Sequence, residues 1–227
     1  MKEFFCFILS FSITFFFLFS KEKEEEKKNE KQNVLKYIKE YAKFSIEEME
    51  KFGIPASIKL GQGILESSSG NSPLAKLTNN HFGIKCGKDW KGDIYYHDDD
   101  LPKECFRKYK SVRESFNDHS KFLKKPRYSE LFLLKKKDYR SWAIGLKKAG
   151  YATSLKYSNQ LISQIEKYSL WIFDEETSQG IEKRIDKYLT EIKMKKTKKT
   201  IFESFFQSHF FKKISFFLKK YVKLEKK

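Results

Sequence analysis

The sequence from Gln62 to Ala75 reads QGILESSSGNSPLA, a hydrophobic helical run followed by a turn of small residues. Pro55 suits the first turn of a helix over about 55–68, which places Glu66 near its C-terminal end. Apolar neighbours and the negative end of the helix dipole both disfavour a carboxylate there, so both raise its pKa. A general acid working near neutral pH needs such a raised pKa. On spacing alone, an ordinary surface glutamate at a helix end explains the pattern better.

Helical spacing of apolar residues occurs on both sides of this stretch. Before it, Val34, Tyr37, Ile38 and Tyr41 fall on one helix face. After it, the spacing predicts helices over 112–123, 139–148 and about 161–168. Residues 86–110 differ, because tyrosines and phenylalanines there alternate with turn formers. They predict a small β-hairpin with strands near 93–97 and 104–109. Together these patterns predict an α+β domain with a mainly helical lobe and a small β-hairpin lobe.

The chain has 227 residues, enough for one domain with a core and tails but short for two. Residues 1–20, uncharged from residue 4 onward, are interpreted as a signal peptide, either cleaved or kept as a membrane anchor. Residues 21–33 (KEKEEEKKNEKQN) are predicted to be a charged linker. The folded domain is expected over 34–174, and 175–227 form a basic, aromatic-rich C-terminal tail.

The formal net charge of +17 favours anionic partners such as nucleic acid, a membrane surface or an acidic polymer. Many of the lysines lie in charge runs, which are usually solvated faces, so we expect no nucleic-acid binding. In the tail, phenylalanines recur near helical spacing with lysines between them. This pattern is typical of a helix on an anionic membrane or polymer, and an ordinary helix packed on its own domain fits it equally well.

A second polar motif, NNHFGIK, spans 79–85. Its asparagines offer amide groups suited to sugar hydroxyls and acetamido groups, and Phe82 offers an apolar surface. Asn80 and Phe82 are therefore candidate substrate-binding residues, although a plain turn with a buried phenylalanine gives the same pattern. His81 has no carboxylate or cysteine partner implied by spacing, so we interpret it as structural or as part of a cleft wall.

Four motifs, in this order, resemble glycoside hydrolase family 73, the peptidoglycan N-acetylglucosaminidases. They are LES-x-x-G-x-S-x-LA at 65–75, NN-x-FGIK at 79–85, FR-x-Y at 106–109 and GYAT at 150–153. The resemblance covers roughly 34–174, which identifies this segment as a glucosaminidase catalytic domain. It implies a lysozyme-like fold with a cleft between the two lobes. It also implies cleavage of the β-1,4 bond after N-acetylglucosamine, with no cofactor and no metal.

By this resemblance, Glu66 matches the acid that protonates the leaving oxygen, and Tyr151 matches a tyrosine that lines the cleft. The resemblance also implies a second carboxylate on the hairpin. The sequence departs from the family there, since it has Asp98, Asp99 and Asp100 in place of a Thr-Glu-Tyr-like stretch. We favour this cluster over Glu104, without choosing among its members, as the group that activates water or stabilises an oxocarbenium-like transition state. A substrate-assisted route through the acetamido group remains open and would not need a nucleophilic carboxylate.

Sugar stacking is a second point of departure. Ser69 stands where many relatives have tryptophan, so one stacking surface is missing. Trp90 and Tyr96 are the candidates to replace it. Gln62, one helical turn before Glu66, is a further candidate for contact with substrate.

Cys86 and Cys105 flank the predicted hairpin. In an exported protein such a pair is a disulfide candidate, and closing a loop of about 20 residues contributes roughly 3 kcal/mol on a loop-entropy model. A zinc site is a weaker interpretation, because the histidines nearby give no recognised spacing.

The sequence thus predicts an exported peptidoglycan hydrolase of the periplasm or cell envelope, a monomer that acts on glycan strands in wall remodelling. Membrane association through 4–20 and the basic tail is part of the hypothesis. Two alternatives remain: a muramidase or lytic transglycosylase of the same fold, or a glycan-binding protein without activity.

Overall fold

The structure is a computed structural model that describes residues 2–88, 90–99, 101–194 and 197, with side chains from residue 21 onward. It divides into two units, Met1–Ile181 and Glu182–Lys227. In the second unit, residues 182–194 are helical, and the aromatic-rich part of the predicted tail lies outside the described residues. The side chains of the predicted signal segment lie outside them too. Among the described residues, no helix is long and apolar enough to cross a membrane.

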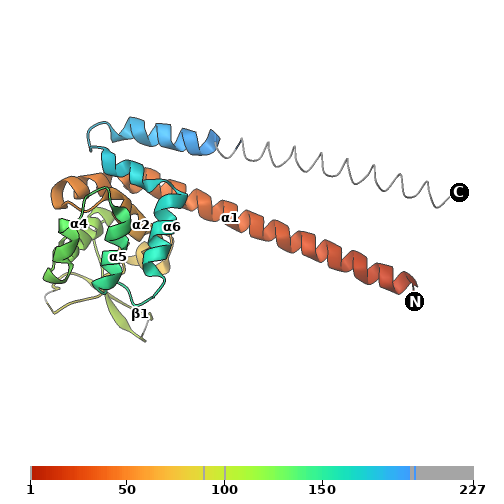
Figure 1. Ribbon diagram of the computed structural model, residues 1–227. Coiled ribbons are helices and arrows are strands. Elements are labelled where there is room, and N and C mark those ends of the chain that lie inside the picture. Colours follow the sequence, from red (N-terminus) through yellow and green to blue (C-terminus); the bar gives the residue numbers. More distant parts are fainter. Residues whose placement is uncertain (1, 89, 100, 195–196, 198–227) are drawn as a thin grey trace. The chain divides into compact units, whose positions relative to one another are not determined.

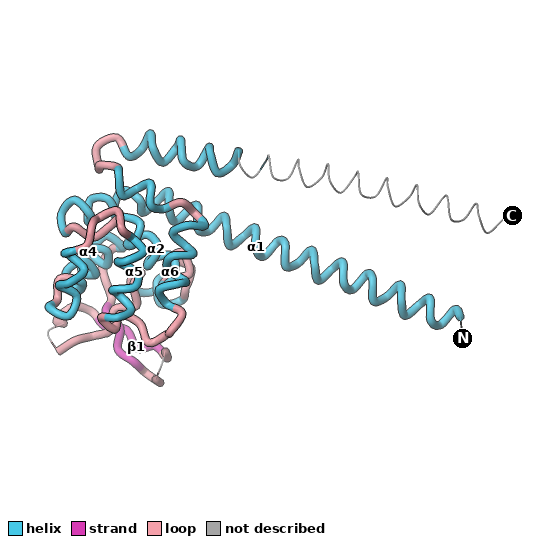
Figure 2. Tube along the Cα trace, viewed as in Figure 1, coloured by secondary structure: helices cyan, strands magenta, loops and turns pink. Residues whose placement is uncertain are grey.

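The first unit combines helices with one antiparallel hairpin, and Figure 2 shows the hairpin at one end of the helical lobe. The elements described are, in chain order, α1 (Lys2–Phe52), α2 (Ala56–Glu66), α3 (Pro73–Thr78), β1 (Ile94–His97), β2 (Glu104–Arg107), α4 (Val112–Leu123), η1 (Pro126–Leu133), α5 (Tyr139–Lys148), α6 (Tyr157–Lys167) and η2 (Leu170–Glu175), where η marks a 3-10 helix (Figure 1). This confirms the predicted α+β class and its helix-hairpin-helix order.

The α2 helix forms the centre of the helical lobe. All its residues from Ala56 to Ile64 are buried, and it packs against α1, α6 and η2. Two glycines allow this close packing. A Cβ on Gly61 would lie 2.7 Å from Leu161, and one on Gly63 would lie 2.2 Å from the Tyr37 hydroxyl. Larger residues at these two positions would push the neighbouring helices away from α2.

The N-terminal end of α2 is capped from a distant part of the chain. Pro55 occupies the N-cap position and has no side chain that can accept a hydrogen bond. The Asp174 carboxylate takes this role, accepting from the Ser57 amide at 2.8 Å and the Ser57 hydroxyl at 2.6 Å. Asp174 lies in η2, so this contact joins the start of the central helix to the end of the domain.

The hairpin pairs β1 with β2 in the predicted place, with Tyr95 opposite Phe106 and Tyr96 opposite Cys105. The predicted disulfide between Cys86 and Cys105 is confirmed, with Cα atoms 5.4 Å apart. It ties the loop that enters the hairpin to the strand that leaves it.

Residues 21–33 differ from the expected linker, because they continue α1 as helix, with 21–30 exposed. Glutamate and lysine are good helix formers, and their charges can pair at i,i+4 along an exposed face, so this composition suits a solvated helix. Val34, at the start of the predicted folded domain, is buried. At the other end the core extends beyond the expected boundary at 174, because Ile181 is buried as well.

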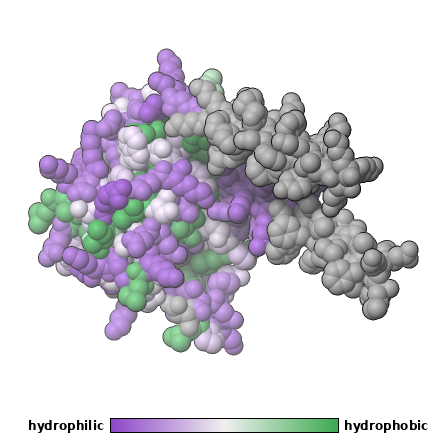
Figure 3. Space-filling model, turned by 45° about the vertical axis from the view of Figure 1, so that its right-hand side comes forward, coloured by the Kyte–Doolittle hydropathy of each residue, from purple (hydrophilic) through white to green (hydrophobic). Residues whose placement is uncertain are grey.

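The face of the molecule in Figure 3 carries mainly hydrophilic side chains with apolar residues scattered among them. Leu133 and Leu155 are among the exposed large apolar residues of the described chain. Apolar side chains scattered in this way are ordinary for a soluble domain surface and do not by themselves mark an interface.

Removing the distant cap should destabilise the domain. We expect Asp174→Ala to lower the free energy of unfolding by about 2 kcal/mol, because the buried Ser57 amide loses its acceptor. Asp174→Asn should cost less, since an amide oxygen can still accept. Urea denaturation measures both, with Glu175→Ala as the neighbouring control, because the ion pair of Glu175 with Lys137 lies at the surface. Equal stability of the alanine and asparagine variants would argue against capping.

The disulfide closes a loop over a sequence separation of 19. We expect the Cys86→Ser/Cys105→Ser double variant to lose about 3 kcal/mol of unfolding free energy. Thermal unfolding of the oxidised protein, the reduced protein and the double variant measures this loss. Reduced and double-variant proteins should agree, and an unchanged melting temperature in both would contradict the expected contribution.

Candidate active site

A cleft of about 670 Å³ lies between the helical lobe and the hairpin. Its walls come from the C-terminal end of α2, the loop after α3, the hairpin and the turn after α5. Its lining residues include Glu66, Phe82, His97, Asp99 and Tyr151. The structure therefore brings together, from three distant segments, three of the five residues that the sequence singled out as catalytic, namely Glu66, Asp99 and Tyr151.

Glu66 is the last residue of α2 and opens into the cleft. More than a third of its surface is exposed, yet loss of water around the carboxyl group raises its pKa to about 7. The two observations agree for a residue on a cleft floor, where water arrives from one side and protein surrounds the others. A hydrogen bond from Tyr157 lowers the pKa, and the negative charge of Asp99 raises it, both less strongly than desolvation.

Gln62 and Tyr157 form the support behind Glu66. The Gln62 side-chain amide donates to the Tyr157 hydroxyl at 2.8 Å, and Tyr157 in turn hydrogen-bonds the Glu66 carboxyl group. Gln62 is fully buried, so it cannot contact a glycan as the sequence led us to expect. Its role in the fold is to orient Tyr157.

The three hairpin aspartates have different surroundings. Asp99 lines the cleft, and its side chain lies 3.2 Å from the Lys85 ammonium group. An oxygen of Asp98 accepts from the Lys103 amide at 2.7 Å and so closes the hairpin turn. Asp100 lies outside the described residues. Glu104, which the sequence disfavoured as the second carboxylate, also bonds Lys85, at 2.8 Å. Of the described acids of the hairpin, Asp99 is the one whose charge acts on Glu66.

Tyr151 occupies the cleft wall, in the turn after α5. Gly150 has φ +73°, a left-handed conformation in which glycine is unstrained, and it directs the chain from α5 to Tyr151. The Arg127 guanidinium group fixes this turn by donating to the carbonyls of Ala149 and Gly150. The Tyr151 ring stacks on Tyr157 with centroids 5.5 Å apart, so the two tyrosines lie side by side near Glu66.

Three other expected substrate contacts fall elsewhere. Asn80 is 1% exposed, and its amide bonds Ile84 and the Arg107 carbonyl, so it holds its own loop and cannot bind a sugar. Trp90 is covered by the Arg107 guanidinium group at 4.7 Å and lines a different hollow. Tyr96 is 62% exposed on the hairpin and does not line the cleft. Phe82 does line it, although most of its ring is buried against His119.

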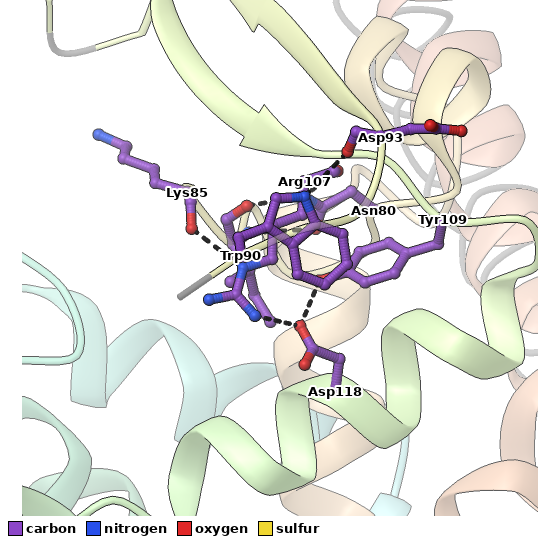
Figure 4. A network of polar contacts seen from close by, with 8 residues as sticks. Asn80, Lys85, Trp90, Asp93, Arg107, Tyr109 and Asp118 are labelled. Atoms are coloured by element: carbon purple, nitrogen blue, oxygen red, sulfur yellow. Dashed lines mark hydrogen bonds and ion pairs between the residues drawn. The ribbon is translucent and has the colours of Figure 1, made fainter. Parts of the chain in front are cut away.

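The FR-x-Y motif anchors the hairpin to α4. Asp118 accepts from Arg107 at 2.8 Å and from the Tyr109 hydroxyl at 2.7 Å (Figure 4). Arg107 also donates to the Lys85 carbonyl at 3.2 Å, and Figure 4 shows Trp90 lying over it. This network fixes the base of the hairpin, and hence the position of Asp99 across the cleft from α2.

A second hollow of about 660 Å³ lies beside α4 and is lined by Trp90 and several charged residues. Two of its acids are already paired, Glu47 with Arg113 and Asp118 with Arg107. The cleft, by contrast, holds Glu66, whose carboxyl group has a pKa raised to about 7 by loss of water. The cleft is therefore the better candidate for acid catalysis.

The sequence did not predict Tyr157 as a partner of Glu66, nor any role for Lys59 or His119. Lys59 is fully buried and bonds His119 at 2.9 Å. These partners lie far apart in the chain, so the spacing of residues along the sequence cannot predict their contacts. A lysine on the otherwise apolar run before Glu66 is the only signal the sequence offers.

A mainly helical lobe, a small hairpin and a cleft with a near-neutral glutamate define a lysozyme-like domain of the glycoside hydrolase type. Residues 42–170 match the glucosaminidase family, described as mannosyl-glycoprotein endo-beta-N-acetylglucosaminidase, and the chain belongs to this family. This confirms the predicted resemblance to glycoside hydrolase family 73.

Individual relatives agree with this assignment. The chain is 34% identical over 140 residues to the exo-glucosaminidase LytG of Bacillus subtilis, covering 56% of this chain and 48% of the relative. It is 34% identical over 127 residues to the peptidoglycan hydrolase FlgJ of Vibrio parahaemolyticus, covering 51% and 41%. The chain thus spans less than half the length of these curated relatives. A solved peptidoglycan hydrolase from Sphingomonas sp. A1 shares the fold, with a TM-score of 0.54 and 24% identity over 61% of this chain and 92% of that one.

The electrostatics of Glu66 can be tested without substrate. We expect a carbon-13 NMR titration of its carboxyl group to give a pKa of about 7. Asp99→Asn should lower this pKa because it removes a negative charge, and Tyr157→Phe should raise it because it removes a hydrogen bond to the carboxylate. Asp98→Asn, which keeps the turn oxygen, is the matched control. A shift of the same size in both aspartate variants would contradict a specific role of Asp99.

Proposed function

We propose that this protein is a peptidoglycan hydrolase, an endo-β-N-acetylglucosaminidase that cleaves the β-1,4 bond between N-acetylglucosamine and N-acetylmuramic acid. The observation that carries the proposal is the Glu66 carboxyl group, held at the end of a buried helix on the cleft floor with a pKa of about 7. Membership of the glucosaminidase family supports the choice of sugar, and the printed names of its relatives support peptidoglycan as substrate.

In this proposal protonated Glu66 donates its proton to the glycosidic oxygen as the bond from that oxygen to the anomeric carbon breaks. Water adds to the anomeric carbon and gives a proton to a carboxylate of the cleft, so N-acetylglucosamine becomes the new reducing end. Because Glu66 must hold a proton to act, activity is present below about pH 7 and falls as the pH rises through the Glu66 pKa. The raised pKa therefore extends acid catalysis to near-neutral pH.

Asp99 is proposed as the second carboxylate. It shares the cleft with Glu66, and its charge acts on Glu66. Lys85 forms ion pairs with both Asp99 and Glu104. This arrangement supports a fixed position of the Asp99 carboxylate on the hairpin side of the cleft. Its proposed role is to activate the attacking water or to stabilise the positive charge that develops at the anomeric carbon. If the substrate acetamido group attacks the anomeric carbon instead, Asp99 would only stabilise the positive charge.

Export to the periplasm or cell envelope is part of the proposal. The disulfide between Cys86 and Cys105 favours an oxidising compartment. The formal net charge of +17 would hold the protein near anionic glycan strands, which affects encounter and retention but not chemistry. We propose that it acts there as a monomer in wall remodelling.

The function can be tested by mass spectrometry of muropeptides released from purified peptidoglycan. We expect wild-type protein to release fragments with reducing-end N-acetylglucosamine, and Glu66→Gln to reduce release by at least about 100-fold, because it removes the acid. Glu175→Gln serves as the control. Glu175 is exposed and does not line the cleft, so this variant should behave like wild type.

Each other product points to another enzyme. Anhydromuramic ends would identify a lytic transglycosylase, and reducing-end N-acetylmuramic acid would identify a muramidase. Binding to peptidoglycan without release above the Glu66→Gln level would identify a glycan-binding protein. Any of these results would overturn the proposed glucosaminidase activity.

A further inference from the structure

A buried chain of polar groups runs behind the cleft, from Lys59 through His119 to Tyr151. Lys59 and His119 are both fully buried, whereas Tyr151 lines the cleft. The Lys59 ammonium group lies 2.9 Å from His119 Nδ1, and His119 Nε2 lies 3.0 Å from the Tyr151 hydroxyl. A buried lysine without a direct carboxylate contact is costly, so its retention beside the cleft calls for a specific reason.

The surroundings of Lys59 Nζ determine the direction of these hydrogen bonds. An ammonium group has three hydrogens, and three acceptors surround it: the Phe116 carbonyl at 2.7 Å, the Ser120 hydroxyl at 2.9 Å and His119 Nδ1. Ser120 can accept from Lys59 because its own hydrogen goes to the Phe116 carbonyl, at 3.2 Å. His119 Nδ1 must then be the acceptor.

An accepting Nδ1 fixes the state of the whole ring. Burial and the nearby Lys59 charge hold the pKa of His119 well below its ordinary value, so the ring is neutral. A neutral ring whose Nδ1 accepts carries its hydrogen on Nε2. His119 Nε2 therefore donates to the Tyr151 hydroxyl oxygen, so Tyr151, whose side chain lines the cleft, does not use its own hydrogen to bond His119.

The opposite direction would present different chemistry to a ligand. A neutral Lys59 could accept from His119 Nδ1, and Tyr151 would then have to donate to Nε2 and offer only lone pairs to the cleft. Burial lowers the Lys59 pKa to about 7, while the negative charges of Glu48 on α1 and Asp118 on α4 raise it. The ammonium form thus prevails below about pH 7, the range in which Glu66 also holds its proton.

We propose that Lys59 and His119 are positioning residues that fix Tyr151 as a hydrogen-bond donor to an oxygen of the bound glycan. The proposal rests on the proposed function of the cleft and adds a division of labour between its two tyrosines. Tyr157 serves the Glu66 carboxyl group, and Tyr151 serves the substrate.

A purely structural role for His119 would require its ring and not its N–H group. Its ring stacks on Phe82 with centroids 3.9 Å apart and planes 5° apart, so packing alone could require an aromatic residue at this position. Two variants separate the alternatives. His119→Gln keeps an N–H donor near the Nε2 position without the ring, and His119→Phe keeps the stacked ring without the donor.

If the donor matters, kcat for peptidoglycan release should fall about tenfold in His119→Phe and less than about threefold in His119→Gln, since about one net hydrogen bond is lost in the first. In a Tyr151→Phe background the His119→Phe change should have little further effect, because the hydroxyl it orients is gone. The reverse order of the two variants, or fully additive effects with Tyr151→Phe, would show that His119 acts by packing and would overturn the proposal.

Nitrogen-15 NMR of the histidine rings gives a readout independent of activity. In wild-type protein we expect the His119 resonances of a neutral ring with unprotonated Nδ1 and protonated Nε2, assigned by their absence from His119→Gln. Lys59→Met should lose this fixed tautomer while keeping the fold, which circular dichroism checks. The opposite tautomer in wild type would overturn the proposal even in an active enzyme. If wild-type protein shows the expected tautomer but no glycanase activity, the proposed function is wrong, whereas the inferred hydrogen-bond order from Lys59 through His119 to Tyr151 still holds.

Discussion

The α2 helix is enclosed by protein along nearly its whole length, and this burial governs most of what surrounds it. A buried helix must have its free N-terminal amides, its polar side chains and its close contacts satisfied by neighbours. Asp174 supplies the acceptor at its start, and Tyr157 pairs with the Gln62 amide. Gly61 and Gly63 let α6 and α1 approach closely enough to exclude water. The other end of the same helix opens into the cleft.

Burial at one end and opening at the other explain the chemistry of Glu66. Protein on several sides disfavours its charge, while the open side leaves room for a glycan. Its two closest electrostatic influences act in opposite directions, since Tyr157 favours the carboxylate and Asp99 disfavours it. One comes from the helical lobe and the other from the hairpin. The acidity of Glu66 therefore depends on how the two lobes meet.

A disulfide and a set of hydrogen bonds at the base of the hairpin fix its position against the helical lobe. The disulfide joins the entering loop to β2, and Asp118 on α4 holds Arg107 and Tyr109. Small hairpins are marginal on their own, so these ties supply the rigidity that two short strands lack. They also explain why the FR-x-Y motif belongs to the architecture of the site: Phe106 and Arg107 line the cleft, and Arg107 and Tyr109 anchor the hairpin to α4.

By itself the sequence determined the elements, because helix and strand periodicity and turn residues are local properties. Helices over 112–123 and 139–148, the hairpin, its disulfide and the placement of Glu66 at a helix end all followed from local pattern or motif order. Only the tertiary structure decided which polar groups meet. It separated Asp99 from Asp98, made Asn80 and Gln62 structural, removed Trp90 from the cleft and joined Lys59 to Tyr151 through His119. Hydrogen bonds and desolvation depend on distances between residues remote in the chain, and no local spacing encodes those distances.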